Sequence, residues 1–143
     1  MKNPLVSIIV PVYNVEAFLN KCLDSLIDQK LSTIEIICVN DASTDGSLGI
    51  LESYAERDPR IRIIDKPTNE GLSATRNVGI AAVKGDWTMF VDSDDFVNPE
   101  LCSNAYECAS NKGADLVIYD YSSFSSDTEL YKESDQNSRL DGF

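Results

Sequence analysis

The 143-residue sequence predicts an α/β fold with a mostly parallel central sheet. Short apolar runs rich in β-branched residues alternate along the chain with longer segments of helical periodicity, and this alternation is typical of layered α/β folds. The earliest runs are apolar at nearly every position, as expected for parallel strands that are buried on both faces. The length suits one domain with a proper core.

Periodicity and local signals place the elements in order. The expected strands cover residues 5–10, 34–39, 61–64, 87–91 and 115–119. The expected helices cover residues 15–28, 48–57, 71–84 and 98–111. Pro11 ends the first strand, and Asn14 is expected to cap the first helix. Asp58 and Pro59 stop the second helix, Gly85 fits the stop of the third, and Pro99 lies in the first turn of the fourth.

Residue size predicts how these elements pack. One face of the first helix is expected to pack on the sheet through apolar residues at helical spacing: Phe18, Leu19, Cys22, Leu23, Leu26 and Ile27. The third helix carries small residues that would allow close packing on the sheet: Ala74, Gly79, Ala81 and Ala82. Residues 87–91 are expected to form a buried strand. From Tyr121 on the pattern fades, with at most an edge strand near Leu130 and Tyr131, so we divide the chain into a domain over residues 1–120 and a polar C-terminal segment over residues 121–143.

Composition excludes several classes of function. Twelve basic residues against 24 acidic ones give a net charge of -12, which argues against a nucleic-acid partner because phosphate backbones bind basic surfaces. A phosphate ligand still fits where a metal ion neutralises it. The sequence has no histidine, which excludes a histidine-based triad, a histidine general base and the usual histidine type of zinc site.

The cysteine pattern and the lack of targeting signals predict a cytoplasmic protein. The four cysteines show no CxxC spacing, and Cys22, Cys38 and Cys108 fall in apolar patterns that indicate reduced core residues. No signal peptide is visible before the first strand. No apolar run approaches the roughly 20 residues that a transmembrane segment needs.

Three acids stand directly after the fourth predicted strand, at Asp92, Asp94 and Asp95. Ligands of open parallel sheets bind at the carboxyl ends of the strands. Two like charges about 4 Å apart cost roughly 1 kcal/mol in water and ~4 kcal/mol at an effective dielectric of 20. A divalent cation relieves this repulsion, and carboxylate oxygens suit Mg²⁺ or Mn²⁺. The alternative is a solvated acidic turn that opens the next helix.

Polar loops follow three of the strands, over residues 11–14, 40–47 and 92–95, and they are expected to meet at one edge of the sheet. Together they offer what a nucleotide site needs: an apolar slot for the base, acceptors for the ribose hydroxyls and a cation for the pyrophosphate. Asp41 would accept from a base N–H and Tyr13 would lie against a ring. The glycine-rich phosphate loops GxGxxG and GxxxxGK[ST] are missing.

Four segments of this sequence resemble the family 2 glycosyltransferases. They are VSIIVPVYN at residues 6–14, VNDASTDGS at 39–47, NEGLSATRNVG at 69–79 and FVDSDD at 90–95. The four motifs occur in the family's order and spacing across about residues 5–120. The resemblance implies a GT-A fold, which is a Rossmann-like αβα sandwich that binds a nucleotide-sugar, most often a UDP-sugar.

The resemblance also implies roles for individual residues. Asp92, Ser93 and Asp94 match the family's DXD motif, in which Asp94 would ligate Mn²⁺ or Mg²⁺ at the diphosphate and Asp92 would lie near the ribose and the metal. Asp41 would bond the uracil imide. The base slot would be lined by Pro11, Val12 and Tyr13, with Glu16 at its edge. Arg76, with Asn77 nearby, would face the diphosphate or the sugar; the alternative for Arg76 is a surface helix charge.

The family transfers the sugar with inversion, by direct attack of an acceptor hydroxyl that an Asp or Glu deprotonates. That base normally lies well after the DXD motif, and no residue of this chain is nominated for it. Residues 121–143 would then begin an acceptor-side half, and the chain would bind donor without transferring it. The expected role is polysaccharide or other glycan synthesis with a glycan or lipid-linked acceptor, and peripheral membrane association stays open.

Two other functions remain as alternatives. A nucleotidyltransferase would usually hold its triphosphate with a glycine-rich basic loop after the first strand, and residues 11–14 contain no Gly, Arg or Lys. A non-catalytic nucleotide-sugar-binding module would bind the donor alone.

Overall fold

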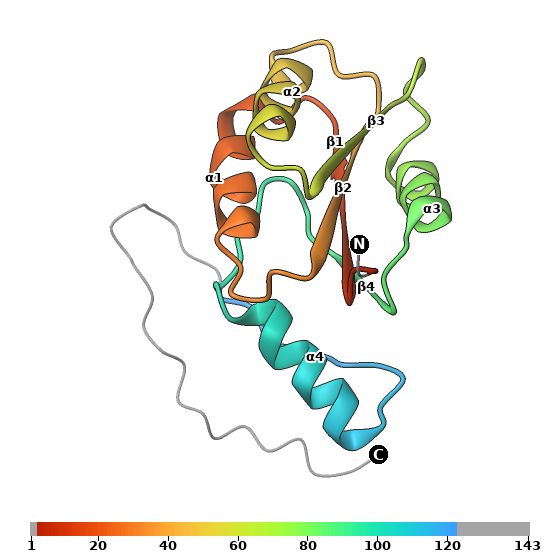
Figure 1. The fold of residues 1–143 in the computed structure, drawn as a ribbon. Coiled ribbons are helices and arrows are strands. Elements are labelled where there is room, and N and C mark those ends of the chain that lie inside the picture. Colours follow the sequence, from red (N-terminus) through yellow and green to blue (C-terminus); the bar gives the residue numbers. More distant parts are fainter. Residues whose placement is uncertain (1–2, 123–143) are drawn as a thin grey trace.

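The computed structural model describes residues 3–122 and contains a four-stranded parallel sheet with the strand order β3-β2-β1-β4 (Figure 1). The strands are β1 (Val6–Val12), β2 (Ile34–Asn40), β3 (Ile61–Asp65) and β4 (Trp87–Phe90). The helices are α1 (Glu16–Ile27), α2 (Ser47–Arg57), α3 (Leu72–Ala82) and α4 (Leu101–Lys112). The predicted α/β class and parallel sheet are confirmed.

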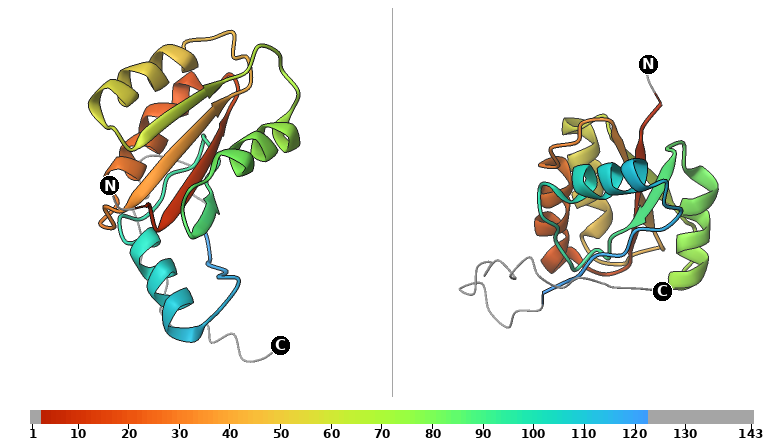
Figure 2. Two further views of the ribbon diagram at one scale, coloured as in Figure 1. Left: turned by 45° about the vertical axis from the view of Figure 1, so that its right-hand side comes forward. Right: turned by 90° about the horizontal axis from the view of Figure 1, so that it is seen from below.

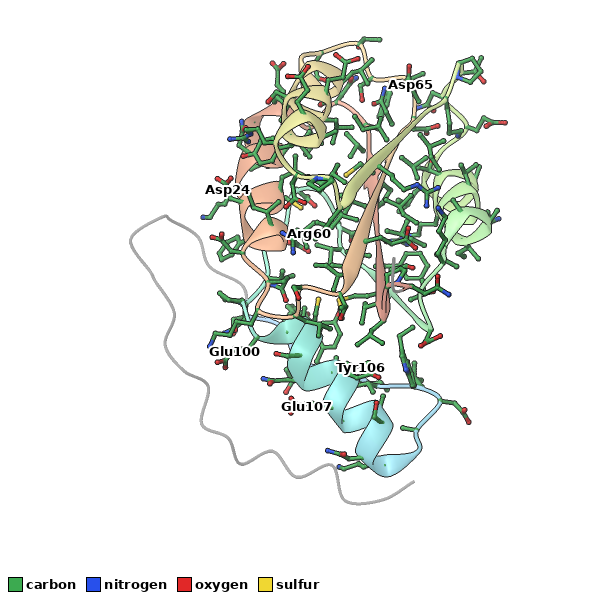
Figure 3. All side chains as sticks on the ribbon, viewed as in Figure 1. Asp24, Arg60, Asp65, Glu100, Tyr106 and Glu107 are labelled. Carbon is green, nitrogen blue, oxygen red and sulfur yellow. The ribbon has the colours of Figure 1, made fainter. Side chains whose placement is uncertain are left out.

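The helices form layers on both faces of the sheet. Helices α1 and α2 cover one face and α3 covers the other, while α4 lies beyond one end of the sheet (Figures 1 and 2). The backbone N–H of Lys30, just before β2, donates to the carbonyl of Pro99 near the start of α4 at 2.9 Å, so α4 is attached at the amino ends of the strands. Figure 3 shows the separation, with Asp65 at the end of β3 far from Glu100 and Tyr106. The opposite end of the sheet is therefore left to the loops that follow the strands.

The two central strands form the core. Every residue of β1 and β2 is buried, as their apolar runs predict. Helix α1 adds four fully buried side chains: Leu19, Cys22, Leu23 and Leu26. Phe18 was predicted to join them but is 59% exposed, because it points away from the sheet side of α1 toward the loops. All four cysteines are free, and Cys108 is half-buried while the other three are buried.

Helix α3 packs closely on the sheet at Gly79. A Cβ atom built there would overlap the Cγ2 methyl of Ile9 and would lie 3.2 Å from its Cγ1. The prediction of close packing is therefore confirmed at this glycine, whereas Ala81 is exposed. The helix ends at Ala82, so Gly85 is not its stop. Gly85 instead contacts β1, since a Cβ there would lie 2.8 Å from the backbone nitrogen of Ser7.

A buried polar cluster fixes the end of α3 to the sheet. Glu35 of β2 accepts hydrogen bonds from the Ser7 hydroxyl and from the backbone N–H of Lys84, both at 2.6 Å, and pairs with Arg62 of β3 at 2.9 Å. Burial raises the pKa of the Glu35 carboxyl, but these hydrogen bonds lower it more, and the net pKa is below the usual value. The buried carboxylate is thus compensated on all sides.

Pro11 does not end β1, which runs on to Val12. The carbonyl of Ile9 accepts from Val91 N on the β4 side, and Pro11, two residues further, faces the same side. Pairing with β4 stops at Ile9 and Phe90, so the N–H that proline lacks has no strand to serve there.

Three further expectations are wrong. Asn14 does not cap α1, whose N-cap position is Val15 with no capping side chain. Strand β4 is not buried, since Thr88 and Phe90 are exposed at the edge of the described sheet. Residues 115–119 form no strand, because no neighbouring strand pairs with them in the described chain, and the side chains at positions 116 and 118 are both 74% exposed.

The strand expected near residues 130–131 lies outside the described residues, as does most of the predicted C-terminal segment. Within residues 3–122 no helix has the length and apolar character needed to cross a bilayer.

Candidate functional site

A cleft of about 610 Å³ opens at the carboxyl ends of β1, β2 and β4. It is lined by Pro11, Val12, Tyr13, Asn14, Val15, Phe18, Asp41, Asn69, Gly71, Leu72, Thr75, Asp92, Ser93 and Asp94. The three loops expected to meet do meet here, and the start of α3 forms a fourth wall. Glu16, Arg76 and Asn77 were predicted for the site but are not among the lining residues.

The loops after β1 and β2 are tied together by hydrogen bonds. The Asn14 side-chain oxygen accepts from the backbone N–H of Thr44 at 2.8 Å, and the Asn14 backbone N–H donates to the Ser43 hydroxyl at 3.1 Å. Asn14 and Ala42 both have positive φ, at 49° and 57°, which is uncommon outside glycine. Glu16 belongs to this set of contacts, because its carboxylate accepts from Gly46 N. Its position is therefore beside the cleft, in the loop-to-loop contact.

The apolar part of the cleft has a buried floor and an exposed rim. Pro11 and Val12 are buried at the end of β1, whereas Tyr13 is 50% exposed above them. Phe18 and Leu72, at 59% and 52% exposure, complete the rim from α1 and α3. Neither residue was predicted for the site, because helical spacing predicts a core position for Phe18 and the motif around Leu72 gave this residue no role of its own.

Asp41 is the buried acid of the cleft, with a residue exposure of only 2%. It accepts from the side chain of Lys66 and from the backbone N–H groups of Glu70, at 3.0 Å, and Gly71, at 2.9 Å. Burial raises the pKa of this carboxyl, but the bonds from Lys66 and the two N–H groups outweigh burial and leave the pKa below its usual range. The carboxyl is therefore ionised at neutral pH despite its burial.

The acidic corner of the site is formed by Asp92, Asp94 and Asp95. Arg76 reaches it from the first turns of α3. Its Nη2 lies 2.7 Å from Oδ1 of Asp92, and its guanidinium lies 5.7 Å from the centre of the Phe90 ring. Its Nε is buried and has no hydrogen-bond partner among the described residues. Arg76 therefore has a specific partner just after β4, although its side chain is 35% exposed and it does not line the cleft. Asn77 is exposed on the same helix.

The remaining acids of this corner keep their mutual repulsion. Asp94 and Asp95 are exposed, and neither forms an ion pair within the part of the chain that the structure describes. Burial raises the pKa of the Asp95 carboxyl, and the neighbouring Asp94 and Asp92 raise it further. Burial likewise raises the pKa of the Cys22 thiol to about 12, with the three acids adding to the shift. The acids do not open the next helix, because α4 begins only at Leu101.

The donor set fits a divalent cation that arrives with a ligand. Asp92 and Asp94 present carboxylates to the cleft, but no group of three or more potential metal ligands lies together in residues 3–122. Mg²⁺ typically keeps several waters and binds through one or two carboxylates together with substrate phosphates. Two carboxylates at the cleft, next to an uncompensated acid, match that pattern rather than an all-protein cage.

Known proteins are similar to this chain in sequence. Residues 7–143 match the family described as "Glycosyl transferase family 2". Over 128 residues the chain is 49% identical to an uncharacterized glycosyltransferase, EpsJ, of Bacillus subtilis (strain 168), which covers 90% of this chain and 37% of that protein. Over 126 residues it is 42% identical to the glycosyltransferase GlyA of Streptococcus pneumoniae serotype 4, which covers 88% of this chain and 18% of that protein.

Solved structures of other proteins are similar to this chain in fold. The crystal structure of S. aureus TarS 1-349 in complex with UDP-GlcNAc superposes with a TM-score of 0.73 and 34% sequence identity, over 77% of this chain and 32% of that one. The mannosyltransferase PcManGT from Pyrobaculum calidifontis, at 24% identity, shares the fold with a TM-score of 0.70. The chain spans less than two fifths of the length of each of the two relatives and of both structures. It has the GT-A, Rossmann-like fold and belongs to glycosyl transferase family 2.

Proposed function

We propose that the chain is the donor-binding part of a glycosyltransferase and holds a UDP-sugar in the cleft at the carboxyl ends of β1, β2 and β4. The observation that carries this proposal is the convergence of all four sequence motifs on that one cleft. The solved structure of TarS with UDP-GlcNAc, at 34% identity, supports the choice of a UDP-sugar. Polysaccharide or other glycan synthesis is the process in which such a transfer belongs.

The base would occupy the apolar side of the cleft. Pro11 and Val12 would form its floor, and Tyr13 would lie against the ring with half of its surface free for that contact. Asp41 would accept a hydrogen bond from the N–H of the base, since an ionised carboxylate acts only as an acceptor. These contacts would fix the orientation of the nucleotide.

The diphosphate would lie toward the acidic corner. Asp94, exposed and without an ion pair in the described chain, would be the main ligand of Mn²⁺ or Mg²⁺, with Asp92 beside it near the ribose. Ser93 is buried between them and would hold the turn. When bound, the cation would supply charge neutralisation for the departing diphosphate. Arg76 already lies at Asp92 and would add a positive charge on the same side.

Transfer would proceed by direct attack of an acceptor hydroxyl, with inversion at the sugar carbon. The relatives are longer than this chain, and we assign the general base and the acceptor site to sequence outside the motifs discussed here. Donor binding without turnover is therefore the expected behaviour of the 143-residue chain.

A thermal-shift series tests the proposal. The protein is melted with UDP, GDP, CDP or ATP, each with Mn²⁺ and with a chelator. A ligand at 100 times its Kd should stabilise by about 2.7 kcal/mol, which corresponds to several degrees for a domain of this size. We expect a UDP-selective shift that needs Mn²⁺ and is lost in Asp94→Asn. The matched control is Asp86→Asn, an exposed acid before β4 that does not line the cleft. An equal response to every nucleotide, or none to UDP, would contradict the proposal.

A further inference from the structure

We propose that Lys66 determines the base selectivity of the cleft by holding Asp41 as an oriented hydrogen-bond acceptor. Lys66 does not line the cleft and belongs to none of the four sequence motifs. The inference rests on the nucleotide-binding function proposed above. It concerns a positioning residue that acts through Asp41.

Lys66 is buried at the junction of three elements. It directly follows β3, and its backbone N–H donates to the carbonyl of Asn40 at the end of β2 at 2.9 Å. Its side chain is only 5% exposed. The ammonium contacts the Asp41 carboxylate, Oε2 of Glu70 at 3.0 Å and the hydroxyl of Thr75 at 3.4 Å.

These contacts leave Lys66 without a free N–H for a ligand. A lysine ammonium has three N–H donors, and the three contacts use all of them. Its positive charge is directed mainly at Asp41, which is 3% exposed in its side chain, whereas the Glu70 side chain is 57% exposed and partly screened by solvent. The effect of Lys66 on a bound nucleotide must therefore pass through Asp41.

The hydrogen bonds of Asp41 leave one acceptor position free. Oδ1 accepts from Lys66 and from Glu70 N, and Oδ2 accepts from Gly71 N. The Thr75 hydroxyl also lies near this carboxyl and lowers its pKa, but its single hydrogen is directed to the carbonyl of Gly71 at 2.8 Å. A carboxylate offers about four lone-pair positions, so one remains on Oδ2 of this cleft residue. A base that meets it must present an N–H.

This geometry separates two pyrimidines. Uracil carries a hydrogen at N3 and can donate to Oδ2, whereas N3 of cytosine is an acceptor and would face a negative oxygen. A site built to hydrogen-bond a ligand N–H strongly rejects an analogue that lacks it. The free acceptor position is therefore a selectivity device for uracil over cytosine, provided that Asp41 stays ionised.

Lys66 supplies the positive charge that favours the ionised form of Asp41 in this buried position, together with the N–H groups of Glu70 and Gly71. Lys66 is the charged group that contacts Asp41, and the carboxylate of Glu70 pairs with the same ammonium. Without the ammonium, the two backbone N–H bonds would have to offset burial, which favours the neutral carboxyl, by themselves. A neutral carboxyl carries an O–H donor, which can bond N3 of cytosine. Removing Lys66 should thus shift preference from uracil toward cytosine, and not merely weaken binding.

Calorimetric titration with UDP and CDP in the presence of Mn²⁺ tests this, at a mildly acidic and at a neutral pH. The variants are Lys66→Met and, as the matched control, Lys84→Met, which changes an exposed lysine after α3. We expect the wild type and the control to prefer UDP at both pH values. In Lys66→Met the ratio of UDP to CDP affinity should fall at least tenfold, and further at the lower pH. An equal loss of both affinities, with the ratio unchanged, would overturn the proposal and leave Lys66 a structural role only.

A second measurement needs no nucleotide. Carbon NMR titration of the Asp41 carboxyl should show a higher pKa in Lys66→Met than in the wild type, and an unchanged pKa would overturn the proposal. Should the wild type bind no UDP at all, the proposed function fails, while the titration still decides the role of Lys66. Should Lys66→Met not fold, Lys66→Gln keeps a hydrogen-bond donor at this position without the charge and should show the same loss of selectivity. A Lys66→Gln variant that keeps the wild-type ratio would contradict the inference.

Discussion

Gly79 and Gly49 form a matched pair that measures how closely α3 lies on the sheet. Both are inside helices, in α3 and α2. A Cβ at Gly79 would overlap the Cγ2 methyl of Ile9 and lie 3.2 and 3.3 Å from its Cγ1 and Cδ1, whereas among the described residues nothing lies within 4 Å of a Cβ at Gly49. Substitution by Ala therefore adds the same methyl group to a filled space in one case and to an open one in the other.

The two effects have opposite signs. Replacing a glycine inside a helix by Ala stabilises by roughly 0.5–1 kcal/mol, and this gain applies at both positions. Overpacking a well-filled core costs typically about 1–3 kcal/mol, and this cost applies only at Gly79. We expect Gly49→Ala to raise the free energy of unfolding, and Gly79→Ala to lie about 1–3 kcal/mol below it.

Urea unfolding followed by far-UV circular dichroism measures both variants against the wild type. A shift of the midpoint with an unchanged slope reports a change in stability. If Gly79→Ala proves as stable as Gly49→Ala, α3 does not approach Ile9 as closely as the structure has it. A changed slope in one variant alone would point to an altered denatured state and would also contradict the reasoning.

Three other changes should have measurable effects on urea unfolding. Asn14→Ala should lower stability by about 1–3 kcal/mol, because its φ of 49° strains alanine and the bond to Thr44 is lost, whereas Asn14→Gly should lose less. Asp95→Asn should stabilise the cation-free protein at neutral pH, because burial and the neighbouring acids raise the pKa of this carboxyl and so disfavour its charged form. The pKa of Glu35 is lowered from 4.5, so its contribution should be full above that value and vanish as the pH falls through the lowered pKa; Glu35→Gln should flatten this dependence. Equal losses of stability in Asn14→Ala and Asn14→Gly would contradict the role of the positive φ. Destabilisation by Asp95→Asn, or an unaltered pH profile in Glu35→Gln, would contradict the electrostatic reasoning for that carboxyl.

Local sequence predicted the strands best where burial is complete. Residues of β1 and β2 are mostly apolar and are buried on both faces, so pattern and environment agree. The end of β1 was predicted wrongly because the tolerance of Pro11 depends on where β4 stops, which is a property of another strand. The prediction of a strand at residues 115–119 failed for the converse reason: the segment has strand character, but no described strand pairs with it.

The candidate site was predicted best at the residues that directly follow strands. Asp41, Asp92 and Asp94 come just after apolar runs, and the sheet brings all three to one cleft. Lys66 was missed because a lysine between a strand and a proline resembles an ordinary loop charge, and only the folded chain buries it against Asp41. The partner of Arg76 was equally unreadable, since α3 and the end of β4 meet only in three dimensions.

The contact between the loops after β1 and β2 has a consequence for how tightly a ligand can bind. Fixing the backbone of one loop residue costs about 1–2 kcal/mol in conformational entropy. Here the Asn14 and Thr44 hydrogen bond, together with that of Glu16 to Gly46, meets this cost during folding, before any ligand arrives. A preorganised wall spares the ligand that ordering penalty and permits rigid docking. Residues that do not line the cleft, such as Glu16, would then influence affinity through the shape they maintain.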